Sequence, residues 1–305
     1  MLHLDATTRK AVAGVLYTAT DTSDGRTQEQ SNLLEALAGH VMRVSPSDAG
    51  VVSPREAAVA LAKPRLRKSV GEILVTLELV RHPPSEELTS RVSEYIDALE
   101  IDDGFQALAA DYLANSRECV GRDWERVRQP NIVESFLEDQ TDEQIIEKMN
   151  ALADLPGGTL GRGLFDFYRR NGFAFIPEDE PDQDNLIPHD LTHVIAGYGA
   201  TAEAEVALQA FMVGAARGES HFSSLLASLL LFEVGMLPFP GIEPTSGVLA
   251  QPGAAELFAT AVERGLQCHG DIQANHEEML ELPLSEVRAE FGIPEPAPGP
   301  HMFIL

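Results

Sequence analysis

The stretch Thr8-Arg-Lys-Ala-Val-Ala-Gly-Val-Leu-Tyr-Thr-Ala-Thr20 carries the pattern that decides the fold class. Val12, Leu16 and Ala19 place apolar side chains three or four positions apart, which is the period of an α-helix with one buried face. The polar run Asp21–Gly25 then breaks the pattern with residues that favour turns. This stretch therefore predicts an amphipathic helix followed by a turn.

The same helical period, with matching helix starts, recurs further along the chain. A second apolar face covers residues 33–41, and further helices are expected over residues 68–80 and 86–99. Ser53, followed by a proline and then a glutamate, begins one helix, and Thr141 begins another. Alanine, leucine and glutamate are abundant, while runs of β-branched residues are rare. The sequence therefore predicts an all-α fold, a multi-helix bundle with an N-terminal helical accessory domain.

Length and charge narrow the classes of function. The 305 residues, 44% of them hydrophobic, suffice for two ordinary domains or one large one. A formal net charge of −26 repels phosphate backbones, so we expect no nucleic-acid partner. The same charge opposes long-range attraction to an anionic membrane surface.

A few features bear on the cellular location. Cys119 and Cys268 form no Cys-x-x-Cys pattern, so two reduced thiols are expected. The first residues lack the basic and apolar segments of a signal peptide. The longest apolar run, residues 225–237, contains Glu233 and is shorter than the ~20 residues that span a bilayer. We therefore expect a cytoplasmic protein, at most peripheral to a membrane.

The segment His189-Asp-Leu-Thr-His193 carries the candidate chemistry. Pro188 fits the first turn of a helix, and the two histidines then share one face, so their ring nitrogens can converge on one ion. Asp190 is the candidate catalytic residue, since it can ligate the ion, orient an imidazole or act as a base. The alternative interpretation is a surface His-Asp pair with His193 facing the core.

A carboxylate must return from further along the chain to complete such a site. A straight helix would place Glu205 about 120° round and ~18 Å along the axis from His193. Gly197-Tyr-Gly199 supplies a break, and Thr201 can cap an antiparallel second helix. Spacing alone does not decide whether Glu203 or Glu205 faces the ion.

The candidate ligands also indicate the kind of ion. Two neutral imidazoles and two carboxylates balance the charge of a divalent cation. Mixed nitrogen and oxygen ligation is typical of zinc and also suits iron(II) or manganese. We therefore expect a divalent-metal cofactor, zinc first, with iron or manganese as alternatives.

The spacing His-Asp-x-x-His, eleven residues, then Glu resembles the signature of the coenzyme Q biosynthesis protein 4 family. Further motifs of this chain resemble that family in the same order. These are Leu155-Pro-Gly-Gly-Thr-Leu-Gly161, Phe165-Asp-Phe-Tyr168, Glu205-Val-Ala-Leu-Gln-Ala-Phe211 and Leu282-Pro-Leu-Ser-Glu-Val-Arg288 with Phe291-Gly-Ile293. The resemblance covers residues ~120–293.

The resemblance implies an all-α metal protein of ubiquinone biosynthesis. The implied reaction removes the ring carboxylate at C1 of a polyprenylated hydroxybenzoate and couples this to hydroxylation of C1. Carried onto this chain, the metal ligands are His189, Asp190, His193 and Glu205. The implied partners are a prenylated aromatic or quinone-precursor lipid and other quinone-biosynthesis proteins. A homo-oligomer is also expected.

The remaining chain departs from that family. Asp24-Gly25 followed by Glu29, with helical periodicity across residues 6–113, faintly resembles the TerB-like helical family. The expected domains are therefore a helical accessory domain over 1–115, a metal-binding domain over 116–293 and a Pro-rich tail over 294–305. The segment Phe173–Asn185 is also more acidic than an anionic substrate would favour.

Two other classes of function compete with the enzyme. A non-catalytic prenyl-lipid scaffold is suggested by the apolar segment Phe222–Leu237, which could wall a lipid channel or form an ordinary buried helix. A metal phosphohydrolase is suggested by the His-Asp pair, but it needs further ligands. His221, His269 and His276 have no matching spacing.

Overall fold

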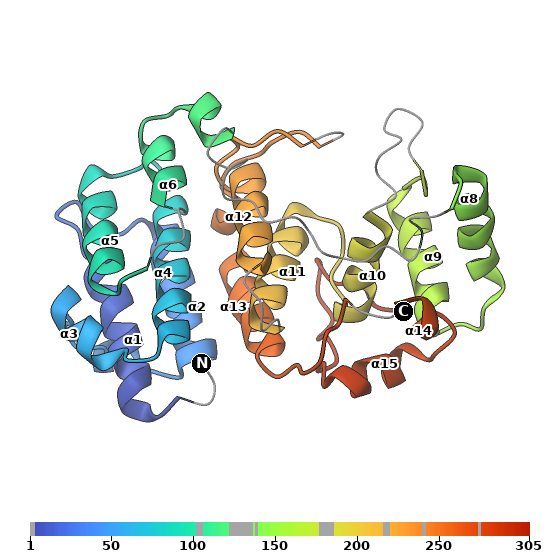
Figure 1. The fold of residues 1–305 in the computed structure, drawn as a ribbon, viewed down its shortest axis with the longest axis horizontal. Helices are drawn as coiled ribbons and strands as arrows, with labels where there is room; N and C mark the ends of the chain where they lie inside the picture. Colours follow the sequence, from blue (N-terminus) through green and yellow to red (C-terminus); the bar gives the residue numbers. More distant parts are fainter. Residues whose placement is uncertain are drawn as a thin grey trace.

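The computed structural model describes residues 4–101, 106–121, 137, 140–176, 186–215, 220–239, 242–273 and 276–305. Within these ranges the chain is helical and forms no strand (Figure 1). The predicted all-α class is therefore confirmed. The acidic residues of 178–184 lie outside the described ranges.

The N-terminal part is a bundle of short helices whose starts follow the capping pattern in the sequence. Ser53 forms the predicted capping box with Glu56, and Asp5 and Thr27 cap two earlier helices. The helices are α1 (Ala6–Ala19), α2 (Gln28–Leu37), α3 (Pro54–Ala60), α4 (Pro64–Leu79), α5 (Glu86–Ala98) and α6 (Gln106–Leu113), with a π-helical turn Ala38–Met42 and a 3-10 turn Pro46–Asp48.

The second part carries the candidate site. Its first helix begins at Thr141, as predicted, and Thr141 forms a capping box with Gln144. The elements are α8 (Asp142–Ala151), α9 (Leu160–Asn171), α10 (Leu186–Ala196), α11 (Ala202–Ala215), α12 (Ser220–Phe232), α13 (Ala254–Gly265), α14 (His276–Met279) and α15 (Leu284–Phe291), with 3-10 turns Leu152–Asp154 and Val248–Ala250.

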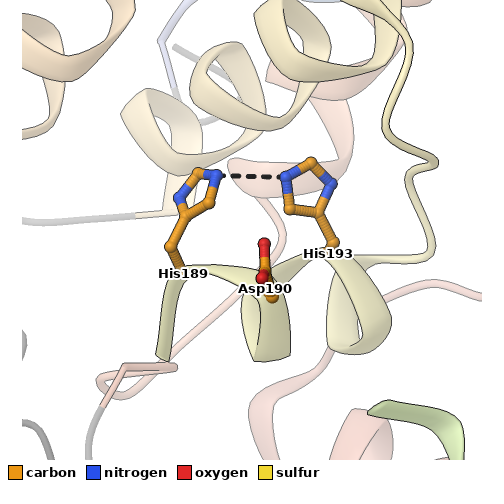
Figure 2. Close-up of side chains that lie close together, drawn as sticks. All are labelled: His189, Asp190 and His193. Atoms are coloured by element: carbon orange, nitrogen blue, oxygen red, sulfur yellow. Dashed lines mark hydrogen bonds between the residues drawn. The ribbon is translucent and has the colours of Figure 1, made fainter. Parts of the chain in front are cut away.

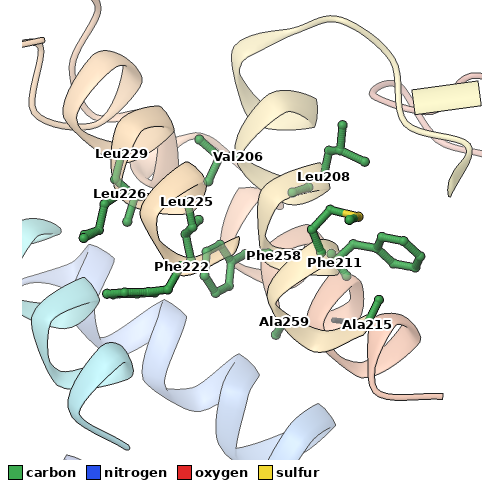
Figure 3. Packing of buried hydrophobic residues seen from close by; sticks show 14 of the residues in the cluster. Val206, Leu208, Phe211, Ala215, Phe222, Leu225, Leu226, Leu229, Phe258 and Ala259 are labelled. Carbon is green, nitrogen blue, oxygen red and sulfur yellow. The ribbon is translucent and has the colours of Figure 1, made fainter. Parts of the chain in front are cut away.

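The two parts share one hydrophobic core. Helix α13 packs against α2, and α12 packs against α4, so the central pair α12 and α13 lies between the N-terminal bundle and the site-bearing helices (Figure 1). Helix α12 is rich in leucine, and its side chains Phe222, Leu226 and Leu229 are buried (Figure 3). This is the arrangement of an ordinary buried helix. No helix of the described residues is long and apolar enough to cross a membrane.

Helices α11 and α13 approach each other closely because glycines line their contact. A Cβ atom on Gly265 would lie 2.1 Å from the Phe211 carbonyl oxygen, and one on Gly214 would lie 2.5 Å from that of Val262. Any side chain at these two positions would push the helices apart. The pair α11–α13 therefore behaves as one packed unit.

The segment after residue 293 packs against the molecule. The Phe303 N–H donates to the Gly197 carbonyl at 3.0 Å, and the Gly199 N–H donates to the His301 carbonyl at 2.8 Å. The Phe303 ring is buried and meets the Phe167 ring edge-on, with 5.1 Å between centroids. The end of the chain therefore supports the turn between α10 and α11.

Candidate metal centre

The site is built on α10 and on the turn that follows it. Gly197 adopts the left-handed conformation (φ 81°), and the N–H groups of Gly197 and Tyr198 both donate to the His193 carbonyl. Thr201 then accepts a hydrogen bond from the Ala204 N–H at 3.3 Å and caps α11. The predicted break and cap therefore return the chain towards the histidines.

Three side chains from the two helices bring their donor atoms together. Nε2 of His189 lies 3.1 Å from Nε2 of His193 (Figure 2). Glu205 reaches both rings: its Oε2 lies 3.4 Å from the His189 nitrogen, and its Oε1 lies 3.2 Å from the His193 nitrogen. Ligands ~2.1 Å from one ion in tetrahedral geometry are themselves about 3.4 Å apart. The observed separations therefore match a common metal ion.

Glu203 has a different neighbour. Its Oε2 lies 3.7 Å from Nδ1 of His301, and that nitrogen is also 2.9 Å from the Thr201 hydroxyl. Because Glu203 and Glu205 point in different directions from α11, only Glu205 reaches the two imidazoles.

Asp190 lies beside the imidazoles. Its carboxylate and the two histidine nitrogens all lie within 4.8 Å of one another (Figure 2). The Tyr168 hydroxyl donates to Asp190 Oδ2 at 2.5 Å. Asp190 can therefore act as a fourth ligand through its other oxygen, or as a proton-carrying group beside the ion.

His193 has an environment that suits a ligand. The residue is fully buried, and its ring stacks on Phe167 with 5.3 Å between centroids. Its Nδ1 is buried without a well-aligned acceptor among the described residues, although the Tyr198 backbone lies close to it. At 3.1 Å, the Nε2 atom of one histidine can accept a hydrogen bond from the other, so one of the two can present a lone pair. This donor set fits a cation.

The charged groups perturb one another's pKa values. Burial acts to raise the pKa of Glu205, but the two imidazoles outweigh it and hold that pKa well below its usual range. Burial acts to lower the pKa of His193, and Glu205 reverses this, leaving it above the ordinary value. Burial raises the pKa of Asp190 despite both histidines. A bound divalent cation would favour the ionised form of both carboxylates.

Tyr168 is a site residue that the spacing argument did not identify. Burial and the neighbouring Asp190 raise its pKa, so its hydroxyl stays protonated and serves as a donor. Its ring stacks on Phe175, with 4.9 Å between centroids. The only signal in the sequence was its place in the aromatic motif of residues 165–168.

No second metal-binding group is found in the described part of the chain. His276 Nε2 lies 2.8 Å from the Ile272 carbonyl, away from any such cluster. A separate cavity of about 400 Å³ lies between α2 and the start of α13, lined by His40 and Glu256 among others. None of the candidate metal ligands lines that cavity.

Comparison with known proteins adds no family to this description. No family model matches the chain, and no curated protein matches it.

Proposed function

We propose that this chain is a divalent-metal enzyme of prenyl-quinone biosynthesis that removes a ring carboxylate from a prenylated hydroxybenzoate. The observation that carries the metal is the convergence of His189, His193 and Glu205 donor atoms at 3.1–3.4 Å. The reaction and pathway are supported by the ordered motifs over residues ~120–293, which resemble the coenzyme Q biosynthesis protein 4 family.

The proposed ligands are His189, His193 and Glu205, with Asp190 as fourth ligand or neighbouring acid. Zinc is the first candidate for this donor set, and iron(II) and manganese are the alternatives. When bound, such an ion holds a substrate carboxylate or phenolate oxygen and accepts negative charge that develops on the ring. Replacing the carboxylate by hydroxyl is a two-electron oxidation, so the coupled step needs an external oxidant such as dioxygen.

Residues of the chain itself supply proton handling and an aromatic surface. Tyr168 donates to Asp190, which places a hydroxyl proton and a carboxylate next to the proposed ion. In the ionised form that a bound cation favours, the Asp190 carboxylate can accept the phenolic proton of the substrate as negative charge develops on that oxygen. Phe173, which is 46% exposed, meets the rings of Phe167 and Tyr168 edge-on. This cluster suits a flat aromatic substrate.

Elemental analysis of the purified protein tests the metal. We expect about one divalent ion per chain in the wild type and loss of that ion in His193→Ala, because this variant removes a buried ligand. A wild type without stoichiometric metal contradicts the proposal. An assay with a prenylated hydroxybenzoate then tests the reaction, with mass spectrometry used to detect the loss of the ring carboxylate. If the metal-loaded wild type leaves this substrate unchanged under dioxygen, the proposed reaction is contradicted, but the proposed metal site is not.

The scaffold alternative makes a different prediction. A non-catalytic scaffold would bind a prenyl lipid and quinone-biosynthesis proteins equally well after loss of His189. Retained lipid binding in His189→Ala, together with no turnover by the metal-loaded wild type, would favour that alternative.

A further inference from the structure

The C-terminal end of α10 is satisfied by two arginines from distant helices. The last four carbonyl groups of a helix have no partner within it. Here the His193 carbonyl accepts from the Gly197 and Tyr198 N–H groups. The three carbonyls that follow it accept from side chains instead. Arg288 Nη2 and Nε donate to Val194 and Ile195 at 3.2 and 2.9 Å, and Arg264 Nη2 donates to Ala196 at 2.8 Å.

Arg264 joins α10 to the pair of helices that carries the third ligand. It lies at the end of α13, next to Gly265, whose backbone contacts that of α11. Its guanidinium lies over the rings of Tyr198 and Phe211, 5.2 and 5.6 Å from their centroids. It also donates to the Pro294 carbonyl at 2.8 Å. Any shift of α10 relative to α11 would therefore break a charged hydrogen bond.

Arg288 makes the equivalent connection from α15. The side chain is buried, and besides its two carbonyls on α10 it donates from Nη1 to Glu295 Oε2 at 2.5 Å. Two positive charges at the negative end of a helix also stabilise that helix. The arginines therefore restrain both the axial position and the rotation of α10.

We infer that Arg264 and Arg288 are positioning residues for the metal centre. The ligands come from two helices: His189 and His193 lie on α10, whereas Glu205 lies on α11. Their donor atoms meet at 3.1–3.4 Å only if the two helices keep their register. The arginines maintain that register without contacting an ion. The inference rests on the proposed metal site and identifies residues that tune its affinity.

Cobalt(II) titration followed by visible absorption measures the effect. We expect Arg264→Gln and Arg288→Gln to bind Co²⁺ at least about tenfold more weakly than the wild type, the lower end of the loss that is typical when a group that orients metal ligands is removed. Arg81→Gln is the matched control. Arg81 is buried and donates to the Gly25 carbonyl in the N-terminal bundle. Its loss should lower the melting temperature but leave Co²⁺ affinity unchanged.

A double-mutant cycle separates positioning from general destabilisation. In a Glu205→Gln background, Arg264→Gln should weaken Co²⁺ binding by less than about threefold, because the contact that it aligns is already impaired. A full tenfold further loss would contradict the inference, as would equal affinities in the wild type and both arginine variants. If the Gln variants fail to fold, Arg264→Lys and Arg288→Lys replace them. Lys can satisfy one carbonyl but not two, so we expect intermediate affinities, and wild-type affinity in both would also contradict the inference.

The same titration distinguishes this inference from the proposed function. A wild type that binds no Co²⁺ removes the metal site itself. If the wild type binds Co²⁺ and both arginine variants bind it equally tightly, the proposed metal site stands and only the positioning role is contradicted.

Discussion

Oε1 of Glu205 lies 3.2 Å from Nε2 of His193, although the two residues belong to different helices. The turn Gly197–Gly199 reverses the chain between them, and α11 presents Glu205 rather than Glu203 to the imidazoles. This contact joins the two helices of the candidate metal centre.

Glutamine substitutions at the two glutamates should therefore differ. Glu205→Gln removes the anionic ligand and should weaken Co²⁺ or Zn²⁺ binding by more than the ~10- to 100-fold typical for loss of an outer partner. Glu203→Gln, next to His301, should leave metal affinity within about threefold of the wild type, a threshold of roughly 0.7 kcal/mol. Isothermal titration with both variants measures this, and equal effects would contradict the assignment of Glu205.

The glycine contact between α11 and α13 should be intolerant of added volume. Gly265→Ala would place Cβ 2.1 Å from the Phe211 carbonyl oxygen, so the helices must separate. We expect a loss of about 3 kcal/mol or more, because overpacking cannot be relieved by a flexible side chain here. Gly39→Ala is the control, since open space surrounds that position. Chemical denaturation of both variants measures the difference, and similar stabilities would contradict the close packing.

His40 should make stability depend on pH. Its Nε2 lies 2.6 Å from Glu256 and its Nδ1 3.1 Å from Glu263, both on α13. The hydrogen bond to Glu256 raises the pKa of His40 above its ordinary value, against the effect of burial. The stabilisation is therefore fully present below about pH 6.5, the unfolded value, and is lost as pH rises through the folded pKa.

The measurement is the melting temperature of the wild type and His40→Gln between pH 5.5 and 8.5. The advantage of the wild type should shrink as pH rises. An advantage that is constant or grows with pH would show that the imidazolium does not stabilise the contact between α13 and the N-terminal bundle.

Glu78 should also make stability fall as pH rises, but for a different reason: the burial of its charged form is costly. Burial raises its pKa to about 7, opposed by a hydrogen bond from the Thr89 hydroxyl. Between pH 4.5, the pKa of Glu78 in the unfolded chain, and pH 7, the folded state keeps the carboxyl proton that the unfolded state has lost. The free energy of unfolding therefore falls as pH rises. Glu78→Gln should therefore stabilise the protein at pH 8 by up to about 3 kcal/mol and have little effect at pH 4.5. Urea denaturation at both values tests this, and no gain at pH 8 would contradict it.

Local pattern was sufficient for the helical class and for the starts at Ser53 and Thr141, whereas α4 begins at Pro64 rather than at the expected residue 68. The capping boxes at Ser53 and Thr141 and the break at Gly197 depend on residues within one turn of each other, so they are readable from the chain. The choice between Glu203 and Glu205 was different. It depends on the rotation of α11 about its own axis, which contacts with α12 and α13 determine.

Contacts between distant segments could not be predicted in this way. Tyr168 and Asp190 are joined across α9 and α10, and Phe303 reaches Phe167 from a segment expected to be only a Pro-rich tail. No sequence spacing predicts either contact, because the two partners lie on different elements that only tertiary packing brings together.

By itself, the sequence determined the all-α class, the helix starts at Ser53 and Thr141 and the pairing of His189 with His193, because each follows from the 3.6-residue period and from hydrogen bonds within one turn. Only the tertiary structure decided which glutamate faces the histidines, that Tyr168 holds Asp190, and that Arg264 and Arg288 secure the end of α10. The reason is physical: these contacts join residues from about 10 to 100 positions apart, and only the packing of side chains between helices sets such distances.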